Sequence, residues 1–204
     1  DIDPTALQCP IPNGKRSSLE YNCSGKHAGM LAVCQQCNWS LANYLERKHP
    51  VQQLVLNKVS ELLRMPAAEF ISAHDDCGVP TYLMQLCQIA TLYARLSSGN
   101  SLDMERIVRA MTHHPLMLAG EGKFDTELMR LTPGELISKS GAEGLQCISR
   151  LGEGMGLVIK VMDGAKRAKY AVAIHLLTQL GWITPSTAQA LEEKFMTLSQ
   201  YKRL

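Results

Sequence analysis

The hydrophobic pattern of the chain changes at Pro133, and this change constrains the fold class. Before it, apolar residues recur at helical spacing, as in the stripe over residues 51–63. After it, residues 144–150 and 155–162 read as two strands, and the short glycine-bearing segment 151–154 between them is typical of an antiparallel hairpin. Helices followed by a hairpin that further helices cover predict an α+β fold.

We therefore expect a mainly helical part over residues 1–133 and a part made of the hairpin and C-terminal helices over residues 134–204, within one continuous domain. Caps, prolines and glycines mark where the helices begin and end. The expected helices span Asn22 to His49, 51–63, Pro80 to about 97, 101–114, 163–180 and 185–204.

Composition excludes several classes of protein. The net charge is +2 and 20% of the residues are charged, so there is no strong electrostatic attraction to nucleic acid or to an anionic membrane. No apolar run approaches the roughly 18 residues that a bilayer span needs. Seven cysteines are an odd number and favour a reducing compartment. We expect a cytoplasmic protein without a nucleic-acid or membrane partner.

The segment Asn22–His27 brings a thiol, a hydroxyl, an amine and an imidazole together at the start of a helix. A helix N-terminus stabilises anions, which predicts a lowered pKa for the Cys23 thiol. Lys26 follows three residues later, so both side chains can face one site. The alternative is a polar helix start whose side chains are solvated.

Two later segments are further candidates. In residues 74–81 the loop can present Asp75 or Cys77 to a pocket, although the same residues also suit a plain turn before a helix. In residues 138–144, Lys139 can bind a carboxylate substrate from an edge strand, or can simply protect that edge.

The pair Cys34 and Cys37 has the spacing of metal or redox sites. No second pair accompanies it, and no strand–helix–strand unit surrounds it. We interpret both as core or boundary residues of a helix, because free cysteines are commonly buried.

Taken together, these segments resemble the bacterial L-asparaginase II family, of the rhizobial inducible type with the serine-β-lactamase-like fold. Order and spacing agree over roughly residues 9–180. The resemblance rests on residues 22–31, His49–Pro50, 75–80, His114–Pro115, 139–144, Asp163–Gly164 and Arg167–Ala168.

The resemblance implies hydrolysis of L-asparagine through a covalent acyl-enzyme, with a zinc ion near the substrate. It gives Cys23, Lys26 and Cys77 as zinc ligands, with catalytic roles for Cys23 and Lys26. Asp75 would hold the amino-acid substrate, and Lys139 would lie on the substrate side. Two thiolates suit zinc, and a lysine ligates only as the neutral amine, which a neighbouring dication favours.

Two departures from the family pattern stand out. Asp76 occupies a position where glycine is usual, which matters if that position has a positive φ. The family also carries a Ser-x-x-Lys nucleophile about a hundred residues before the segment that corresponds to Asn22–His27. Only 22 residues precede Cys23 here, so we expect this chain to correspond to the C-terminal two-thirds of such an asparaginase.

Three hypotheses about function remain open at this level. The first is an L-asparaginase, with a homodimer or a partner segment completing the sheet. The second is a non-catalytic remnant that binds zinc or an amino acid. The third is a zinc hydrolase in which metal-bound water attacks the substrate directly, although two cysteines and a lysine are an unusual catalytic ligand set.

Overall fold

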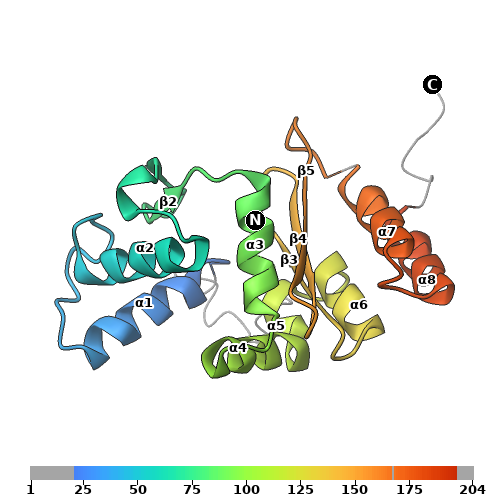
Figure 1. Ribbon diagram of the computed structural model, residues 1–204, viewed down its shortest axis with the longest axis horizontal. Coiled ribbons are helices and arrows are strands. Elements are labelled where there is room, and N and C mark those ends of the chain that lie inside the picture. Colours follow the sequence, from blue (N-terminus) through green and yellow to red (C-terminus); the bar gives the residue numbers. More distant parts are fainter. Residues whose placement is uncertain (1–20, 167, 197–204) are drawn as a thin grey trace, which may run out of the picture. The chain divides into compact units, whose positions relative to one another are not determined.

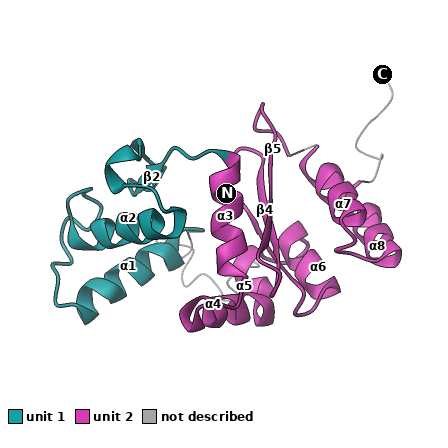
Figure 2. Cartoon of the chain, viewed as in Figure 1, with its two compact units in different colours: residues 1–85 teal, residues 86–204 magenta. Residues whose placement is uncertain are grey.

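The computed structural model describes residues 21–166 and 168–196. The chain divides into two compact units, residues 1–85 and 86–204 (Figure 2). The change of pattern at Pro133 therefore falls inside the second unit. Helices and antiparallel strands in separate stretches make the fold α+β.

The first unit packs two helices and a short hairpin around a small core. Gln52, which is buried, donates hydrogen bonds from its amide to the Tyr44 carbonyl (2.8 Å) and the Met30 sulfur (3.2 Å). The elements are α1 (Ser24–Gln36), α2 (Pro50–Leu63), the 3-10 turn η4 (Ala67–Glu69), β1 (Ser72–His74) and β2 (Pro80–Tyr82). The core residues are Met30, Cys34, Val51 and Val79.

The helix expected from Asn22 to His49 is wrong in its second half. It ends at Gln36 because Asn38 adopts a left-handed conformation (φ 55°). The Trp39 N–H then bonds back to the Cys34 carbonyl (2.8 Å), which closes the last turn. His49 instead caps the next helix, where its Nδ1 accepts the Val51 N–H (3.2 Å).

The helix expected to start near Pro80 begins only at Leu86. Pro80 pairs with His74 in the β1–β2 hairpin. The Leu83 N–H bonds the Ile71 carbonyl (2.9 Å) and extends the pairing. A proline at the first position of a strand is as acceptable as one in the first turn of a helix, so Pro80 alone could not decide between them.

The second unit is built on an antiparallel sheet with strand order β3-β4-β5. Both predicted strands are confirmed as β4 and β5, and a third strand precedes them. The strands are β3 (Leu136–Ser140), β4 (Leu145–Arg150) and β5 (Met155–Lys160). The helices are α3 (Leu86–Leu96), α4 (Leu102–His113), α5 (Pro115–Ala119), α6 (Phe124–Leu131), α7 (Lys169–Gln179) and α8 (Pro185–Phe195).

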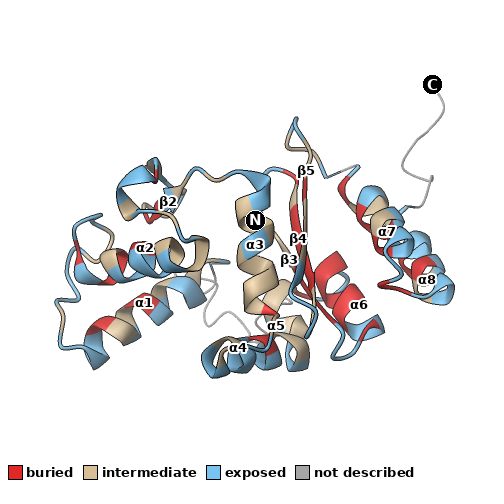
Figure 3. Ribbon diagram, viewed as in Figure 1, coloured by how far each residue is buried: buried red, intermediate tan, exposed pale blue. Residues whose placement is uncertain are grey.

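Helices cover both faces of this sheet (Figure 1). On one face, α6, α7 and α8 pack on the main core; the buried residues of β4 and α6 are visible in Figure 3. On the other face α3 lies against β4 and β5. Its close approach needs Gly156, because a Cβ there would lie 2.2 Å from the Ala90 carbonyl oxygen.

The helix predicted over residues 163–180 begins only at Lys169. An Asx turn holds the preceding loop, in which the Asp163 carboxylate accepts the Ala165 N–H (3.0 Å). The predicted stop at Gly181 is confirmed, with φ 67°. Arg167 and the end of the last predicted helix lie outside the described residues. Among the described helices, all are too short or too polar to cross a bilayer.

Candidate functional site

The first turn of α1 carries two of the predicted site residues. Cys23 occupies the N-cap position, and Lys26 follows within the first turn. The entry to the helix is fixed by the Ser24 N–H, which bonds the Tyr21 carbonyl (2.8 Å). His27 belongs to a different contact, since its Nδ1 lies 2.7 Å from the Tyr44 hydroxyl. Cys23 and Lys26 are the two residues of this segment that take part in the contacts with the β1–β2 turn.

The other two residues lie on the turn between β1 and β2. The Asp75 Oδ1 accepts the N–H groups of Cys77 (2.9 Å) and Val79 (3.0 Å), which folds the turn around one carboxylate oxygen. The positive φ of the turn falls on Gly78 (φ 80°). Asp76 is exposed and has no positive φ, so the substitution at the family's glycine position causes no backbone strain.

The structure brings these two segments together, although 49 residues separate Lys26 from Asp75. The Lys26 ammonium forms an ion pair with the Asp75 Oδ2. The Cys23 and Cys77 thiols lie in hydrogen-bonding contact, and both are free cysteines. The Tyr21 hydroxyl, which the sequence analysis did not single out, also contacts the Cys77 thiol. We call Cys23, Lys26, Asp75 and Cys77 the four-residue cluster.

Ionisation in the cluster is governed by the ion pair. Burial by itself raises the pKa of Asp75, but Lys26 and the two backbone N–H donors outweigh it, so the pKa lies below its usual value. Burial by itself lowers the pKa of Lys26, but Asp75 and the nearby thiols outweigh it, so the pKa is raised. With side chains 37% and 30% exposed, both ions remain accessible to a ligand.

The predicted lowering of the Cys23 pKa is wrong. Burial and the hydrogen bond with Cys77 raise the pKa of this thiol, and the attraction of Lys26 does not compensate. The helix N-terminus predicts the opposite direction, but the sequence does not reveal that a second thiol lies beside the first. In the absence of a metal ion, Cys23 is a protonated thiol at neutral pH.

The cluster fits zinc in donor type, with one condition. Among the described residues, no group of three His, Cys, Asp or Glu side chains is gathered as a metal site. A site here therefore depends on Lys26 as the donor beside the two thiols. Two sulfurs in contact suit zinc, but the amine of Lys26 is held as an ammonium by Asp75 and can ligate only after losing its proton.

Lys139, the remaining predicted site residue, lies in the second unit. It occupies β3, at an edge of the described sheet, opposite Cys147 of β4. Its Nζ donates to the Ser140 carbonyl (2.7 Å). The structure thus gathers four of the predicted residues in one unit and places the fifth on a strand of the other.

The two cysteines Cys34 and Cys37 do not form a metal pair. Cys34 is fully buried in the core of the first unit, and Cys37 is exposed after the end of α1. The interpretation as core and boundary residues is confirmed.

Asp125 is a buried carboxylate that was not among the site residues predicted from the sequence. Asp125 of α6 is buried and accepts hydrogen bonds from β3 and β4. Asp125 lies in the first turn of α6, a helix that was not predicted from the sequence, and aspartate at such a position is common on exposed surfaces. No local signal separates a solvated Asp125 from a buried one.

A comparison with the curated proteins finds no significant match. The family model described as L-asparaginase II matches residues 1–204. Because this match covers the whole sequence, the chain belongs to the L-asparaginase II family.

Proposed function

We propose that this chain is an L-asparaginase, which hydrolyses the side-chain amide of L-asparagine to L-aspartate and ammonia. Family membership supports the reaction class. The observation that carries the proposal for this chain is the four-residue cluster, in which an accessible ionised carboxylate lies beside two thiols and an amine. The second unit, a sheet with helices on both faces, would then be part of a serine-β-lactamase-like fold.

In this proposal Asp75 receives the α-ammonium group of the substrate. Its lowered pKa keeps it anionic, and its Oδ1 is already fixed by the turn, so only Oδ2 is available for exchange. Lys26 holds that oxygen in the structure. The substrate ammonium would replace the Lys26 ammonium, and one ion pair would be exchanged for another.

We also propose that Cys23, Cys77 and Lys26 hold a zinc ion. Lys26 would leave Asp75 as the neutral amine, and both thiols would lose their protons. A zinc ion bound there would supply a Lewis-acidic positive charge beside the amino acid. Lys139 is proposed as a substrate-binding residue, since its cation is suited to the α-carboxylate group.

The test is ammonia release from L-asparagine by the folded chain, its Asp75→Asn variant and a matched Asp76→Asn variant. Asparagine keeps the Oδ1 acceptor that folds the turn and removes the charge that binds the substrate ammonium. A lost charge-assisted hydrogen bond of about 1.5–3 kcal/mol corresponds to a rise in KM of roughly 10- to 100-fold.

Asp76 is exposed and lies next in the chain, so its variant should behave as the wild type does. Absence of ammonia release from the folded wild-type chain would contradict turnover by these 204 residues alone and would favour the hypothesis that the family's Ser-x-x-Lys nucleophile is required. Equal KM values for the two variants would contradict the role of Asp75.

A further inference from the structure

Helix α6 carries three consecutive polar side chains in the interior of the second unit. Asp125, Thr126 and Glu127 are 2%, 0% and 6% exposed. Burying three adjacent polar groups is costly unless each finds its own partners. Each of the three binds a different neighbouring element, so α6 connects several parts of this unit.

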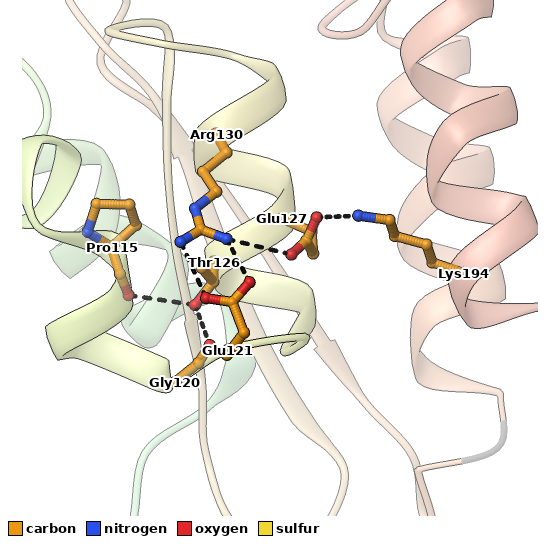
Figure 4. A network of polar contacts seen from close by, with 7 residues as sticks. All are labelled: Pro115, Gly120, Glu121, Thr126, Glu127, Arg130 and Lys194. Atoms are coloured by element: carbon orange, nitrogen blue, oxygen red, sulfur yellow. Dashed lines mark hydrogen bonds and ion pairs between the residues drawn. The ribbon is translucent and has the colours of Figure 1, made fainter. Parts of the chain in front are cut away.

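Two of these side chains have structural partners away from the sheet (Figure 4). The Thr126 hydroxyl lies 3.2 Å from the Pro115 carbonyl and 2.6 Å from the Gly120 carbonyl, which fixes the ends of α5. Glu127 pairs with Arg130 of its own helix (3.6 Å) and with Lys194 of α8. These contacts fasten α6 to its helical neighbours.

Asp125 binds the sheet instead. Its Oδ1 accepts the Ser138 hydroxyl (2.6 Å) and the Gln146 amide (2.7 Å). Its Oδ2 accepts the backbone N–H of Ser140 (2.8 Å). Two of the three donors belong to β3, and the third belongs to the residue of β4 that pairs with Ser140.

The two donors of β3, Ser138 and Ser140, flank Lys139 in the strand. Side chains alternate along a strand, so Ser138 and Ser140 lie on the α6 face and Lys139 lies on the α3 face. Ser140 is held at three points: its N–H by Asp125, its hydroxyl by the Gln146 side chain (2.9 Å) and its carbonyl by the Lys139 ammonium (2.7 Å). Ser140 therefore connects the buried Asp125 carboxylate to the Lys139 amine.

We propose that Asp125 is a positioning residue for Lys139. It holds the Ser138 hydroxyl before Lys139 and the Ser140 backbone N–H after it, and through Ser140 it places the carbonyl that orients the ammonium. The proposal rests on the proposed function, in which Lys139 contacts the substrate. It adds that the geometry of that contact is set from the opposite face of the sheet.

The experiment compares Asp125→Asn with Glu127→Gln, a second buried carboxylate on the same helix. The Asp125→Asn change would keep the shape of the side chain but place an amide N–H₂ against hydrogen-bond donors, so at least one contact to the sheet is lost. Glu127→Gln removes a charge from the ion pairs with Arg130 of α6 and Lys194 of α8, neither of which belongs to β3. Both variants should lower Tm.

The decisive readout is the reactivity of Lys139 toward acetic anhydride, measured by peptide mass spectrometry relative to the exposed Lys58 in the same sample. We expect a change of threefold or more in Asp125→Asn and none in Glu127→Gln. With L-asparagine as substrate, kcat/KM should fall about 10- to 100-fold in Asp125→Asn. In Glu127→Gln it should stay within twofold.

If Asp125→Asn does not fold, Ser138→Ala removes one donor to Asp125 and should shift Lys139 reactivity in the same direction by a smaller factor. Unchanged Lys139 reactivity in a folded variant, or equal changes in Asp125→Asn and Glu127→Gln, would overturn the proposal. A folded wild-type chain that releases no ammonia would contradict turnover by this chain alone, while the labelling ratio would still decide whether Asp125 positions Lys139.

Discussion

At the scale of single residues, Asp75 uses its two carboxylate oxygens for different purposes. Oδ1 folds the β1–β2 turn, and Oδ2 faces the Lys26 ammonium. A side chain fixed at one oxygen presents the other in a defined direction, which reduces the entropy that binding a substrate ammonium would cost. The turn geometry and the proposed recognition thus depend on the same residue.

Cys147 and Cys37 should differ in reactivity because only Cys147 is buried. Burial raises the pKa of the Cys147 thiol to about 11, with the hydrogen bond from Tyr93 opposing this only in part. The thiolate is the reactive form, so Cys147 should resist iodoacetamide at pH 8 in the folded protein. The exposed Cys37 should be alkylated first, as peptide mass spectrometry would show. Alkylation of both at equal rates in the folded chain would contradict the burial of Cys147.

Lys169 should make stability depend on pH. It is 1% exposed, and burial lowers its pKa. Between the lowered pKa of Lys169 in the folded protein and its pKa of about 10.4 in the unfolded chain, the unfolded chain binds more protons than the folded one. The free energy of unfolding therefore rises as the pH rises through this window. Lys169→Met should raise the free energy of unfolding at pH 7, because it removes a buried charge, and this gain should shrink toward pH 10. The substitution also removes the hydrogen bond from the Lys169 amine to the Leu145 carbonyl (3.3 Å), but this carbonyl keeps its bond from the Gly141 N–H (3.0 Å).

Urea unfolding at a series of pH values checks this, with the exposed Lys48→Met as the control. A gain that stays constant across the pH range would contradict the assignment of the titration to Lys169.

The residues of the candidate site differ in how far the sequence could reveal them. Family resemblance was enough to single out Cys23, Lys26, Asp75 and Cys77, which the structure brings together. The pKa of Cys23 was predicted in the wrong direction because it depends on Cys77, which is distant in the chain. Asp125 was missed because its burial depends on the sheet that α6 packs against.

At the scale of secondary-structure elements, α3 can pack closely on β5 because Gly156 has no side chain. A Cβ at Gly156 would lie 2.2 Å from the Ala90 carbonyl oxygen and 3.0 Å from the Ala94 nitrogen, both backbone atoms. Gly156→Ala should therefore destabilise the protein by about 1–3 kcal/mol, since α3 must move away from the sheet.

The matched control is Gly29→Ala in α1, where nothing lies within 4 Å of the added Cβ. Alanine is the better helix former, so this variant should gain up to about 1 kcal/mol. Denaturant unfolding of both variants gives the comparison. A neutral or stabilising Gly156→Ala would show that α3 does not pack as described.

Element prediction succeeded where local signals agreed and failed where two conformations were both locally acceptable. The periodic stripes of α2 and α4 and the β4–β5 hairpin were predicted correctly. The end of α1, the start of α3 and the start of α7 were wrong. Asn38 in a left-handed conformation, the pairing of Pro80 with His74 and the Asx turn at Asp163 set these ends. Each is a choice between two locally acceptable conformations.

At the scale of the whole molecule, the proposed function draws on both compact units. The four-residue cluster belongs to the first unit, and Lys139 with its support from Asp125 belongs to the second. The central claim is that the four-residue cluster is the metal and amino-acid site of an L-asparaginase. The metal half of this claim can be tested without any turnover.

The most direct measurement is the zinc content of the purified chain after equilibration with zinc and removal of the excess. Wild type is compared with Cys77→Ser and with Cys37→Ser, a control cysteine that is exposed outside the cluster. We predict about one zinc per chain in wild type and in Cys37→Ser, and loss of that zinc in Cys77→Ser because the site would keep only one thiolate. Equal zinc content in wild type and Cys77→Ser would contradict the claim.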